Sequence, residues 1–253
     1  MRLTHNLHVH SVVSNCAKRE MLIPDIAREA ERCGLETVAI VDHIDVPEDP
    51  AREALVASNR RIIEKLDTPV RLLAGTETTV VAPGRPAVSE RTRRGLDIVL
   101  LALNHYHLSN VEHPAERSPR AYADHHLLMI RCAAPLPYVD VIVHPFLHAK
   151  IRGLDQREVL NAYDRSALRD ALAVMADHGV RLEISPGHVV AAPDFFREVV
   201  GMGRQVGLRF TIGTDAHRLA DLCYAHGVGP LLESIGLKDS DIALPERVSR
   251  RAS

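Results

Sequence analysis

Seven short apolar runs recur along the chain, and segments with a helical pattern separate most of them. The runs cover residues 3–9, 37–42, 70–76, 97–103, 138–143, 180–185 and 208–213. The helical patterns cover residues 24–33, 51–66, 119–133, 164–178, 193–205 and 229–235. Strands that alternate with helices are typical of a parallel sheet. The sequence therefore predicts an α/β fold, a seven-stranded TIM-like barrel in which the first and last strands become neighbours.

Length and charge limit the classes of protein that fit this pattern. A chain of 253 residues accommodates one barrel, so we expect a single domain over 1–244 and a polar, frayed tail over 245–253. The segment 83–94 is expected to be a solvated loop. The net charge of −2 gives no general attraction to nucleic acid or to a membrane surface. No apolar run approaches the roughly 20 residues of a membrane span.

The cysteines and the start of the chain bear on location. Cys16, Cys33, Cys132 and Cys223 show no CxxC spacing. Scattered cysteines of this kind are typical of reduced thiols in the cytoplasm. The first residues also lack the apolar core of a signal peptide. We therefore expect a cytoplasmic protein, and the sequence gives no indication of its oligomeric state.

Side chains that bind metals stand at the ends of the apolar runs. His8 and His10 are two residues apart, so on a strand their imidazoles share one face. Asp215 and His217 repeat this spacing after the last run. The other candidates follow the middle runs: His43, Glu77, His105 and His144. Because the active site of such a barrel lies at the carboxyl ends of its strands, these side chains are expected to converge.

The joint placement of these residues favours metal binding. A single histidine at a strand end is more often a hydrogen-bonded structural residue, and an HxH pair alone leaves both interpretations open. Candidates at nearly every strand end are harder to explain as separate structural residues. Histidine and carboxylate ligands suit Zn²⁺, Mn²⁺ or Fe²⁺. The set is too large for one ion, so we expect two or three divalent ions.

The ordered motifs resemble those of a known family. HxH on the first run, DH after the second, GxE after the third, histidines after the fourth and fifth, and DxH after the last are similar to the PHP family of polymerase-associated and histidinol-phosphatase-type phosphoesterases. The resemblance covers the chain from His8 to His217 and implies a distorted seven-stranded (β/α)7 barrel with a trinuclear centre. It implies one metal held by His8, His10, Glu77 and Asp215, a second by Glu77, His105 and His144, and a third by His43, His217 and one loop ligand.

Two of these ligand positions leave alternatives. The loop ligand is usually a histidine or an acidic residue in trinuclear relatives, whereas the matching position here is Cys16, with Glu20 close by. A thiolate there suits Zn²⁺ or Fe²⁺ and disfavours Mg²⁺. After the fourth run, His105 and His107 share one face. His105 is preferred as the ligand because it is nearer the strand end.

The predicted function is hydrolysis of small phosphate esters by a metal-dependent phosphomonoesterase similar to histidinol phosphatases. Two divalent ions can hold a bridging hydroxide and bind the phosphate oxygens. The acid for the leaving group stays open between Asp215, His217 and water on the third metal. Arg152 and His188 are the candidates for binding the phosphorylated small-molecule substrate. Glu183 is interpreted as a residue that orients a ligand histidine or only caps neighbouring backbone.

Other functions remain as alternatives. An amidohydrolase-type barrel also opens with HxH, but it requires a lysine on a middle strand, and no lysine follows an apolar run here. A nuclease or phosphodiesterase of the same family is a second alternative. A metal-binding regulatory or nucleic-acid-processing module is a third, for which a basic groove would be expected, and the balanced charge gives it no support.

Overall fold

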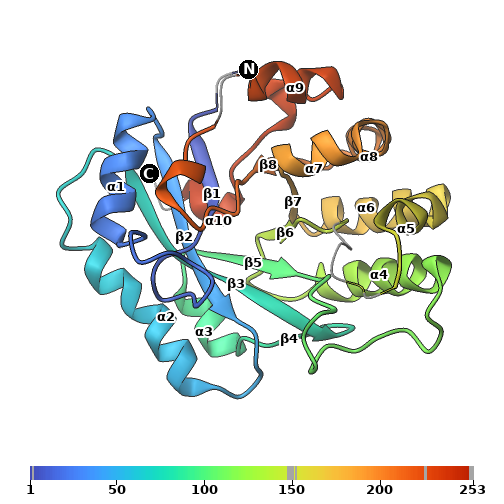
Figure 1. Ribbon diagram of the computed structural model, residues 1–253, viewed down its shortest axis with the longest axis horizontal. Coiled ribbons are helices and arrows are strands. Elements are labelled where there is room, and N and C mark those ends of the chain that lie inside the picture. The colour runs from blue at the N-terminus through green and yellow to red at the C-terminus, as the bar shows by residue number, and fades with distance from the viewer. Residues whose placement is uncertain (2, 147–150, 152, 225–226, 251–253) are drawn as a thin grey trace.

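The strands form a parallel sheet that curls into a nearly closed barrel, with helices around its outside (Figure 1). This computed structural model describes residues 1, 3–146, 151, 153–224 and 227–250. The strands are β1 (His5–Val9), β2 (Thr37–Ile44), β3 (Arg71–Ala82), β4 (Arg85–Pro86), β5 (Ile98–Ala102), β6 (Val141–Val143), β7 (Arg181–Ile184) and β8 (Phe210–Ile212). The helices are α1 (Ile23–Arg32), α2 (Pro50–Ile63), α3 (Glu90–Gly95), α4 (Pro119–Ala133), α5 (Gln156–Ala162), α6 (Arg165–Asp177), α7 (Pro186–Ala191), α8 (Pro193–Gln205), α9 (Val228–Ser234) and α10 (Glu246–Arg250), with 3₁₀ turns η1 (Leu219–Asp221) and η2 (Asp239–Asp241).

The sheet follows the order of the sequence. Its path runs β1-β2-β3-β5-β6-β7-β8, and the short β4 pairs antiparallel with β3. All seven predicted strands are present, although β3 continues to Ala82 and is longer than predicted. Because neighbours along the chain are neighbours in the sheet, the carboxyl ends of the parallel strands meet on one side of the barrel.

Among the described residues, one isolated bridge closes the barrel, so this seam is weaker than the other strand pairs. Val9, at the end of β1, forms an isolated parallel bridge with Ala216, beyond the end of β8. The N–H of His10 donates to the carbonyl of Ala216 at 3.0 Å, and the N–H of Ala216 donates to the carbonyl of His8 at 3.2 Å. The predicted TIM-like barrel is thus confirmed, and its first and last strands meet beside the candidate ligands.

Local signals in the sequence explain where the helices begin. Asp49 caps α2 by accepting from the N–H of Arg52, and Ser118 caps α4 by accepting from the N–H of Ala121. Pro119 occupies the first turn of α4, where its missing N–H is not needed.

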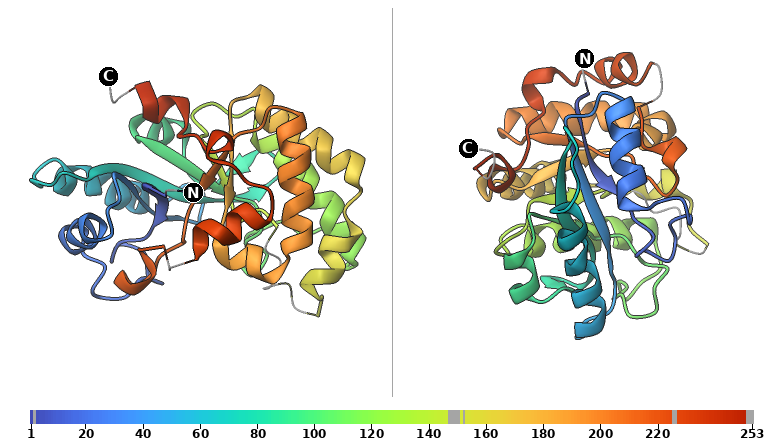
Figure 2. Two further views of the ribbon diagram at one scale, coloured as in Figure 1. Left: turned by 90° about the horizontal axis from the view of Figure 1, so that it is seen from above. Right: turned by 90° about the vertical axis from the view of Figure 1, so that its left-hand side faces the viewer.

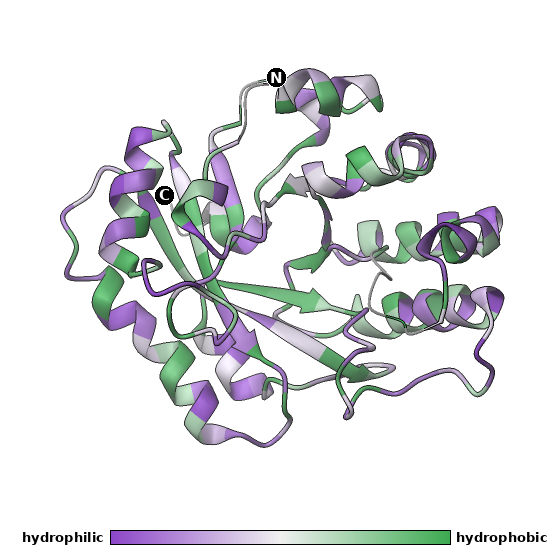
Figure 3. Cartoon of the chain, viewed as in Figure 1, coloured by the Kyte–Doolittle hydropathy of each residue, from purple (hydrophilic) through white to green (hydrophobic). Residues whose placement is uncertain are grey.

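Figure 2 shows α1 and α2 on one side of the strands and the helices α4 to α8 on the other. In Figure 3 these helices carry hydrophilic and hydrophobic residues side by side, whereas β5 is mostly hydrophobic.

The inside of the barrel is filled by apolar side chains, which support the polar strand ends. Leu7, Val41, Leu73 and Leu100 form one buried cluster, and Val248 of α10 joins it. Val248 is fully buried, and its carbonyl accepts from the guanidinium of Arg71 at 2.5 Å, at the start of β3. The prediction of a frayed tail is therefore wrong for residues 246–250. The apolar Val248 within a polar stretch is the feature that holds this segment on the barrel.

The segment 83–94 is also more ordered than predicted. It contains β4 and most of α3. Arg93 is buried, and its guanidinium donates to the carbonyl of Pro137 at 3.0 Å, so this part of the charge run is not a solvated face. The helices α5 and α7 were not predicted either, because they are only seven and six residues long. No described helix is long and apolar enough to cross a membrane.

Two of the four cysteines are paired, contrary to the prediction of reduced thiols. Cys33 follows the end of α1, Cys223 follows η1, and the two form a disulfide with their Cα atoms 5.6 Å apart. Cys16 and Cys132 are free. The paired cysteines are 190 residues apart in the chain, so no local spacing could have indicated the bond.

Candidate metal centre

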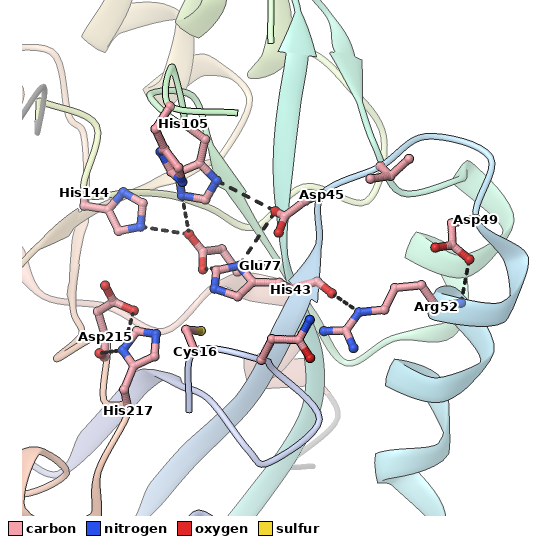
Figure 4. Close-up of a pocket in the computed structure, with 13 residues that line it drawn as sticks. Cys16, His43, Asp45, Asp49, Arg52, Glu77, His105, His144, Asp215 and His217 are labelled. Carbon is pink, nitrogen blue, oxygen red and sulfur yellow. Dashed lines mark hydrogen bonds and ion pairs between the residues drawn. The ribbon is translucent and has the colours of Figure 1, made fainter. Parts of the chain in front are cut away.

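The candidate ligands lie together at the carboxyl ends of the strands. Figure 4 shows those of them that line the neighbouring cavity. The candidate ligands are His8 on β1 and His10 after it, His43 on β2, Glu77 on β3, His105 after β5, His144 after β6, and Asp215 and His217 after β8. The register of the sheet explains the convergence: His43 lies beside Glu77 in the β2–β3 ladder, and Glu77 lies beside Leu100 of β5. Side chains that are far apart in the sequence are therefore placed on one rim by parallel pairing alone.

The first group of donors is formed by His8, His10, Glu77 and Asp215, whose ligand atoms lie within 4.8 Å of one another. Nε2 of His8 and Nε2 of His10 are each 3.3 Å from Oε2 of Glu77. Oδ1 of Asp215 is 3.4 Å from Nε2 of His8 and 3.0 Å from Nε2 of His10. The two ends of the chain thus contribute to one site, as the HxH and DxH spacings predict.

The second group shares Glu77 with the first. Oε1 of Glu77 is 2.8 Å from Nε2 of His144 and 3.5 Å from Nε2 of His105. Figure 4 shows His105 and His144 approaching this carboxylate together. Because its other oxygen faces His8 and His10, Glu77 stands between two groups of imidazoles. This is the placement that a carboxylate bridging two metal ions requires.

The third group contains the cysteine. His10, Cys16, His43 and His217 place ligand atoms within 4.8 Å of one another, and the ring of His10 stacks between those of His43 and His217 at centroid distances of 4.4 and 4.5 Å. Cys16 is therefore the loop residue that joins the group.

The alternatives left open by the sequence lie outside these groups. The carboxylate of Glu20 accepts from the N–H of Leu219 at 3.1 Å. The ring of His107 lies 5.3 Å from that of His105 and lines the neighbouring cavity, but His107 is in no donor group among the described residues. The geometry therefore favours Cys16 over Glu20, and His105 over His107.

Three buried atoms at the centre test whether this set fits metal ions. Nε2 of His8, Nδ1 of His43 and Oε2 of Glu77 are buried, and no hydrogen bond reaches them from the described residues. Buried polar atoms are satisfied in almost all cases, so an unsatisfied group of this kind needs an explanation. Lone pairs of nitrogen and carboxylate oxygen facing each other at 3.1–3.3 Å are stabilised by a shared cation. The donor set therefore fits divalent metal ions.

An outer layer of hydrogen bonds fixes the orientation of the imidazoles. Nδ1 of His8 donates to Oε1 of Glu183 at 2.8 Å, and Oε2 of Glu183 accepts from the N–H of His144 at 3.0 Å. Nδ1 of His144 donates to Oδ1 of Asn104 at 3.2 Å. A Cβ on Gly213 would lie 2.1 Å from Oε1 of Glu183, so only glycine leaves room for this carboxylate. Glu183 thus orients His8, in agreement with the first interpretation from the sequence.

Asp42 holds the loop after β1 in place through hydrogen bonds, a role that the sequence did not indicate. Its side chain is fully buried and accepts from the N–H and the hydroxyl of Ser11 at 2.8 and 2.6 Å, from the hydroxyl of Ser14 at 2.6 Å and from Nδ2 of Asn59 at 2.6 Å. Nδ1 of His10 lies 3.3 Å from the same Ser14 oxygen. Asp42 therefore anchors the loop after β1 and, through Ser14, the ring of His10.

The backbone is strained at two candidate ligands. His144 has φ of 31° and Asp215 has φ of 54°, which non-glycine residues rarely adopt. Such conformations cost about 1–3 kcal/mol each and persist where the surroundings enforce them. His144 follows the end of β6 directly, and Asp215 lies three residues beyond the end of β8. At both positions the turn of the backbone directs the side chain into the centre.

Burial and the facing carboxylates act in opposite directions on the imidazoles. Burial lowers the pKa of His10, but the hydrogen bond to Asp215 and the facing carboxylate of Glu77 outweigh burial and raise this pKa to about 9. Burial likewise lowers the pKa of His105, while Asp45 and Glu77 raise it to about 9. Burial alone would raise the pKa of Glu77, yet the surrounding imidazoles hold it well below its usual value. In the metal-free protein, protons on His10 and His105 therefore balance the carboxylates, and metal ions would displace these protons.

Comparisons with known proteins agree with this geometry. No protein-family profile matches the chain. A curated protein named probable phosphatase, from Caldanaerobacter subterraneus subsp. tengcongensis, is 28% identical over 254 residues, which span 98% of this chain and 87% of that protein. The solved structure of a histidinol phosphate phosphatase from Lactococcus lactis, complexed with zinc, L-histidinol and phosphate, aligns with a TM-score of 0.65 and 16% identity over 98% of both chains. The predicted PHP resemblance is confirmed.

A further solved structure supports the same fold with a lower TM-score. It comes from work on YwqE from Bacillus subtilis and CpsB from Streptococcus pneumoniae, described as metal-dependent tyrosine phosphatases. It aligns with a TM-score of 0.50 and 17% identity, over 98% of this chain and 92% of that one. At this level of identity the solved structures establish the fold, whereas the curated relative extends the likeness to the sequence.

A cavity of about 410 Å³ opens onto the candidate centre. Its wall includes Asp45, Asp49 and Arg52, besides the candidate ligands (Figure 4). Arg52 is the single lysine or arginine on this wall among the described residues. Its Nε donates to the carbonyl of His43 at 2.6 Å, and Nη1 donates to that of Val13 at 2.7 Å. The sequence did not indicate Arg52 as a site residue, because it lies within a predicted helix and belongs to none of the motifs.

Neither of the two predicted substrate-binding residues is among the described residues on the wall of this cavity. Arg152 lies outside the described residues. His188, on α7, has its ring 6.4 Å from that of His144, but it does not line the cavity. Burial and the neighbouring His144 lower the pKa of His188 to about 4. His188 therefore lies beside His144 and outside the cavity.

Proposed function

We propose that this chain is a metal-dependent phosphomonoesterase that hydrolyses small phosphate esters. The observation that carries this proposal is the position of Glu77, whose two carboxylate oxygens face two different groups of imidazoles. A bridged pair of divalent ions is a recurrent arrangement in enzymes that hydrolyse phosphate esters. The likeness to a probable phosphatase and to a zinc-containing histidinol phosphate phosphatase supports the same class.

The ligand assignment follows the three donor groups. His8, His10, Glu77 and Asp215 would hold the first ion, Glu77, His105 and His144 the second, and Cys16, His43 and His217 the third. Imidazole and carboxylate donors favour Zn²⁺, Mn²⁺ or Fe²⁺, and the thiol of Cys16 favours Zn²⁺ or Fe²⁺ at the third position. We therefore expect two or three bound ions.

The metal ions and the side chains at the cavity would have different roles in the hydrolysis. Divalent ions at these positions would polarise the phosphate oxygens and activate water for attack on phosphorus. Asp215 and His217 face the cavity with 39% and 29% of their side chains exposed. Nδ1 of His217 donates to the carbonyl of Asp215 at 2.7 Å, which fixes the ring. These two side chains are the candidates for giving a proton to the leaving alkoxide.

The cavity limits the size of the substrate. A volume of about 410 Å³ is at the small end of ligand sites, so it suits a phosphate on a small leaving group better than a polymer. Arg52 is the cation placed to meet an anionic or polar part of such a substrate. The substrate-binding roles of Arg152 and His188 stay predictions. A cytoplasmic location also stays a prediction, and the Cys33–Cys223 disulfide weighs against it.

A panel of substrates tests the proposed function. The purified protein, supplied with Mn²⁺ or Zn²⁺, would be assayed on an aryl phosphate, an aryl phosphodiester, an aryl ester and a dipeptide. We expect turnover of the phosphomonoester, and none after prolonged chelation until metal is added back. Faster turnover of the diester would favour the nuclease or phosphodiesterase alternative. Turnover of the ester or the dipeptide alone would favour the amidohydrolase alternative and contradict the proposal.

A further inference from the structure

A threonine hydroxyl lies between one candidate ligand and an aspartate outside the donor groups. Nδ1 of His105 is 2.7 Å from Oγ1 of Thr79, and this oxygen is 2.6 Å from Oδ1 of Asp45. The direct separation of His105 Nδ1 from Asp45 Oδ1 is 3.8 Å, which is too long for a hydrogen bond. The hydroxyl of Thr79 is therefore the link between the imidazole and the carboxylate.

The strand register explains how these three residues meet. Asp45 follows the end of β2, Thr79 lies on β3, and His105 follows the end of β5. Ile44 pairs with Thr78 in the β2–β3 ladder, and Thr79 pairs with Ala102 in the β3–β5 ladder, so the three residues occupy adjacent strand ends. Because Glu77 and Thr79 are two residues apart on one strand, both side chains point toward the same face.

The direction of the hydrogen bonds follows from the chemistry of the groups. The carboxylate of an aspartate is ionised at neutral pH and then only accepts hydrogen bonds, and Oδ1 of Asp45 lies 2.6 Å from the hydroxyl of Thr79. The hydroxyl of Thr79 must therefore donate to Asp45 and accept from His105. Nδ1 of His105 then carries a hydrogen, and its Nε2, 3.5 Å from Glu77, is the nitrogen left to bind a cation.

We propose that Thr79 and Asp45 are positioning residues that fix the ring orientation and tautomer of His105 for the second metal site. This inference rests on the proposed function, since it concerns one ligand of the proposed centre. Histidine ligands of metals commonly donate their outer nitrogen to a carboxylate or a carbonyl. Here a hydroxyl stands between the two, so the orientation depends on a side chain that touches neither metal nor substrate.

The neighbouring threonine of β3 provides a matched control. Thr78 is buried like Thr79, but its hydroxyl donates to the main-chain carbonyl of Ile44 at 2.9 Å. It points to the opposite face of the strand from Glu77. Removing the hydroxyl of Thr78 therefore tests the general effect of losing a buried threonine hydrogen bond on this strand, without a change at a ligand.

The test is metal affinity, measured on full-length protein. Metal-free wild type, Thr79→Val, Thr79→Ser and Thr78→Val would be titrated with Zn²⁺ against a chromophoric chelator, and with Co²⁺ to follow the ligand-field absorption. We expect Thr79→Val to weaken one site by about 10- to 100-fold and to change its Co²⁺ spectrum. Thr79→Ser, which keeps the hydroxyl, should restore both, and Thr78→Val should stay within about twofold of wild type.

A second variant tests the link itself. Asp45→Ala should weaken the same site, and the double variant Thr79→Val/Asp45→Ala should bind no more weakly than the more affected single variant, because both act through one path. Additive losses, or affinity of Thr79→Val within twofold of wild type, would overturn the inference. Should Thr79→Val fail to fold, a wild-type affinity of Asp45→Ala would overturn it. A wild-type protein that takes up no metal would instead refute the proposed function.

Discussion

The inner and outer sides of the candidate centre differ in how they are built. On the inner side, His8, His10 and Glu77 have at most 1% of their surface exposed, and they come from strands or from the residue that follows one. On the outer side, Cys16 is exposed on a loop, and the side chain of His217 is 29% exposed. The barrel itself fixes the inner donors, whereas a loop supplies the outer ones.

This difference has an energetic consequence. A buried donor that loses its cation or its partner leaves other polar atoms without hydrogen bonds, which costs about 1–3 kcal/mol for each atom. An exposed donor can be replaced by water at little cost. We therefore expect the inner donors to be essential for metal binding and the outer donors to adjust which metal is preferred and how tightly it binds.

The largest effect is expected from Glu77→Gln, because this carboxylate faces both inner groups. Loss of its charge should remove both ions and lower kcat/KM on an aryl phosphate by about 10³-fold or more. Elemental analysis alongside the kinetics checks this, with the exposed Glu90→Gln as a control. A Glu77→Gln protein that keeps its metal content and its activity would remove the basis of the proposed function.

The next largest effect is expected from His8→Ala, which we compare with His217→Ala. His8→Ala should lower kcat/KM by about 10²- to 10³-fold while the protein stays folded, because this imidazole has no exposed surface through which water could replace it. His217→Ala should lose about tenfold less, because water can reach its position. Steady-state kinetics with circular dichroism checks both. If His217→Ala is the more damaging change, the division into inner and outer sides is wrong.

Substitution of Cys16 should have a smaller effect and should change metal preference. Cys16→Ala should lower the Zn²⁺ content by about one ion and activity by about tenfold or less. Cys16→Asp should shift the preference from Zn²⁺ toward Mn²⁺ or Mg²⁺, since a carboxylate is a harder ligand. Cys132→Ala, at the other free cysteine, is the matched control. Unchanged metal preference in Cys16→Asp would show that Cys16 is not a ligand.

The smallest effect concerns the stability of the metal-free protein. The pKa values of His10 and His105 are raised to about 9 from 6.5, so their stabilising contribution is fully present below pH 6.5 and lost as the pH rises through about 9. The free energy of unfolding should therefore fall over this range, by at most on the order of 3 kcal/mol for each histidine. Urea unfolding of chelated protein at several pH values measures it. Metal-loaded protein should lack this dependence, and an equal dependence in both forms would contradict the ligand assignment.

The sequence predicted the parts of the molecule that depend on repeated local patterns. Seven apolar runs became seven parallel strands, and the rule that barrel sites lie at carboxyl strand ends brought His8 and Asp215 to one place. This prediction works because parallel pairing of consecutive strands leaves few arrangements of their ends.

The features that sequence could not predict depend on contacts between distant segments. Asp42 is recognisable as a support only when Ser14 and Asn59 are seen to surround it. The Cys33–Cys223 bond and the burial of Val248 likewise join segments without a shared motif. The same holds for Thr79, which reads as one of several threonines on a buried strand until the ring of His105 is placed beside it.

The most direct test of the central claim is a crystal structure with anomalous data collected on either side of the zinc, iron and manganese absorption edges. The account predicts one metal peak bonded by His8, His10, Glu77 and Asp215 and a second bonded by Glu77, His105 and His144. Crystals grown with these metals that show no peak beside Glu77 would contradict it.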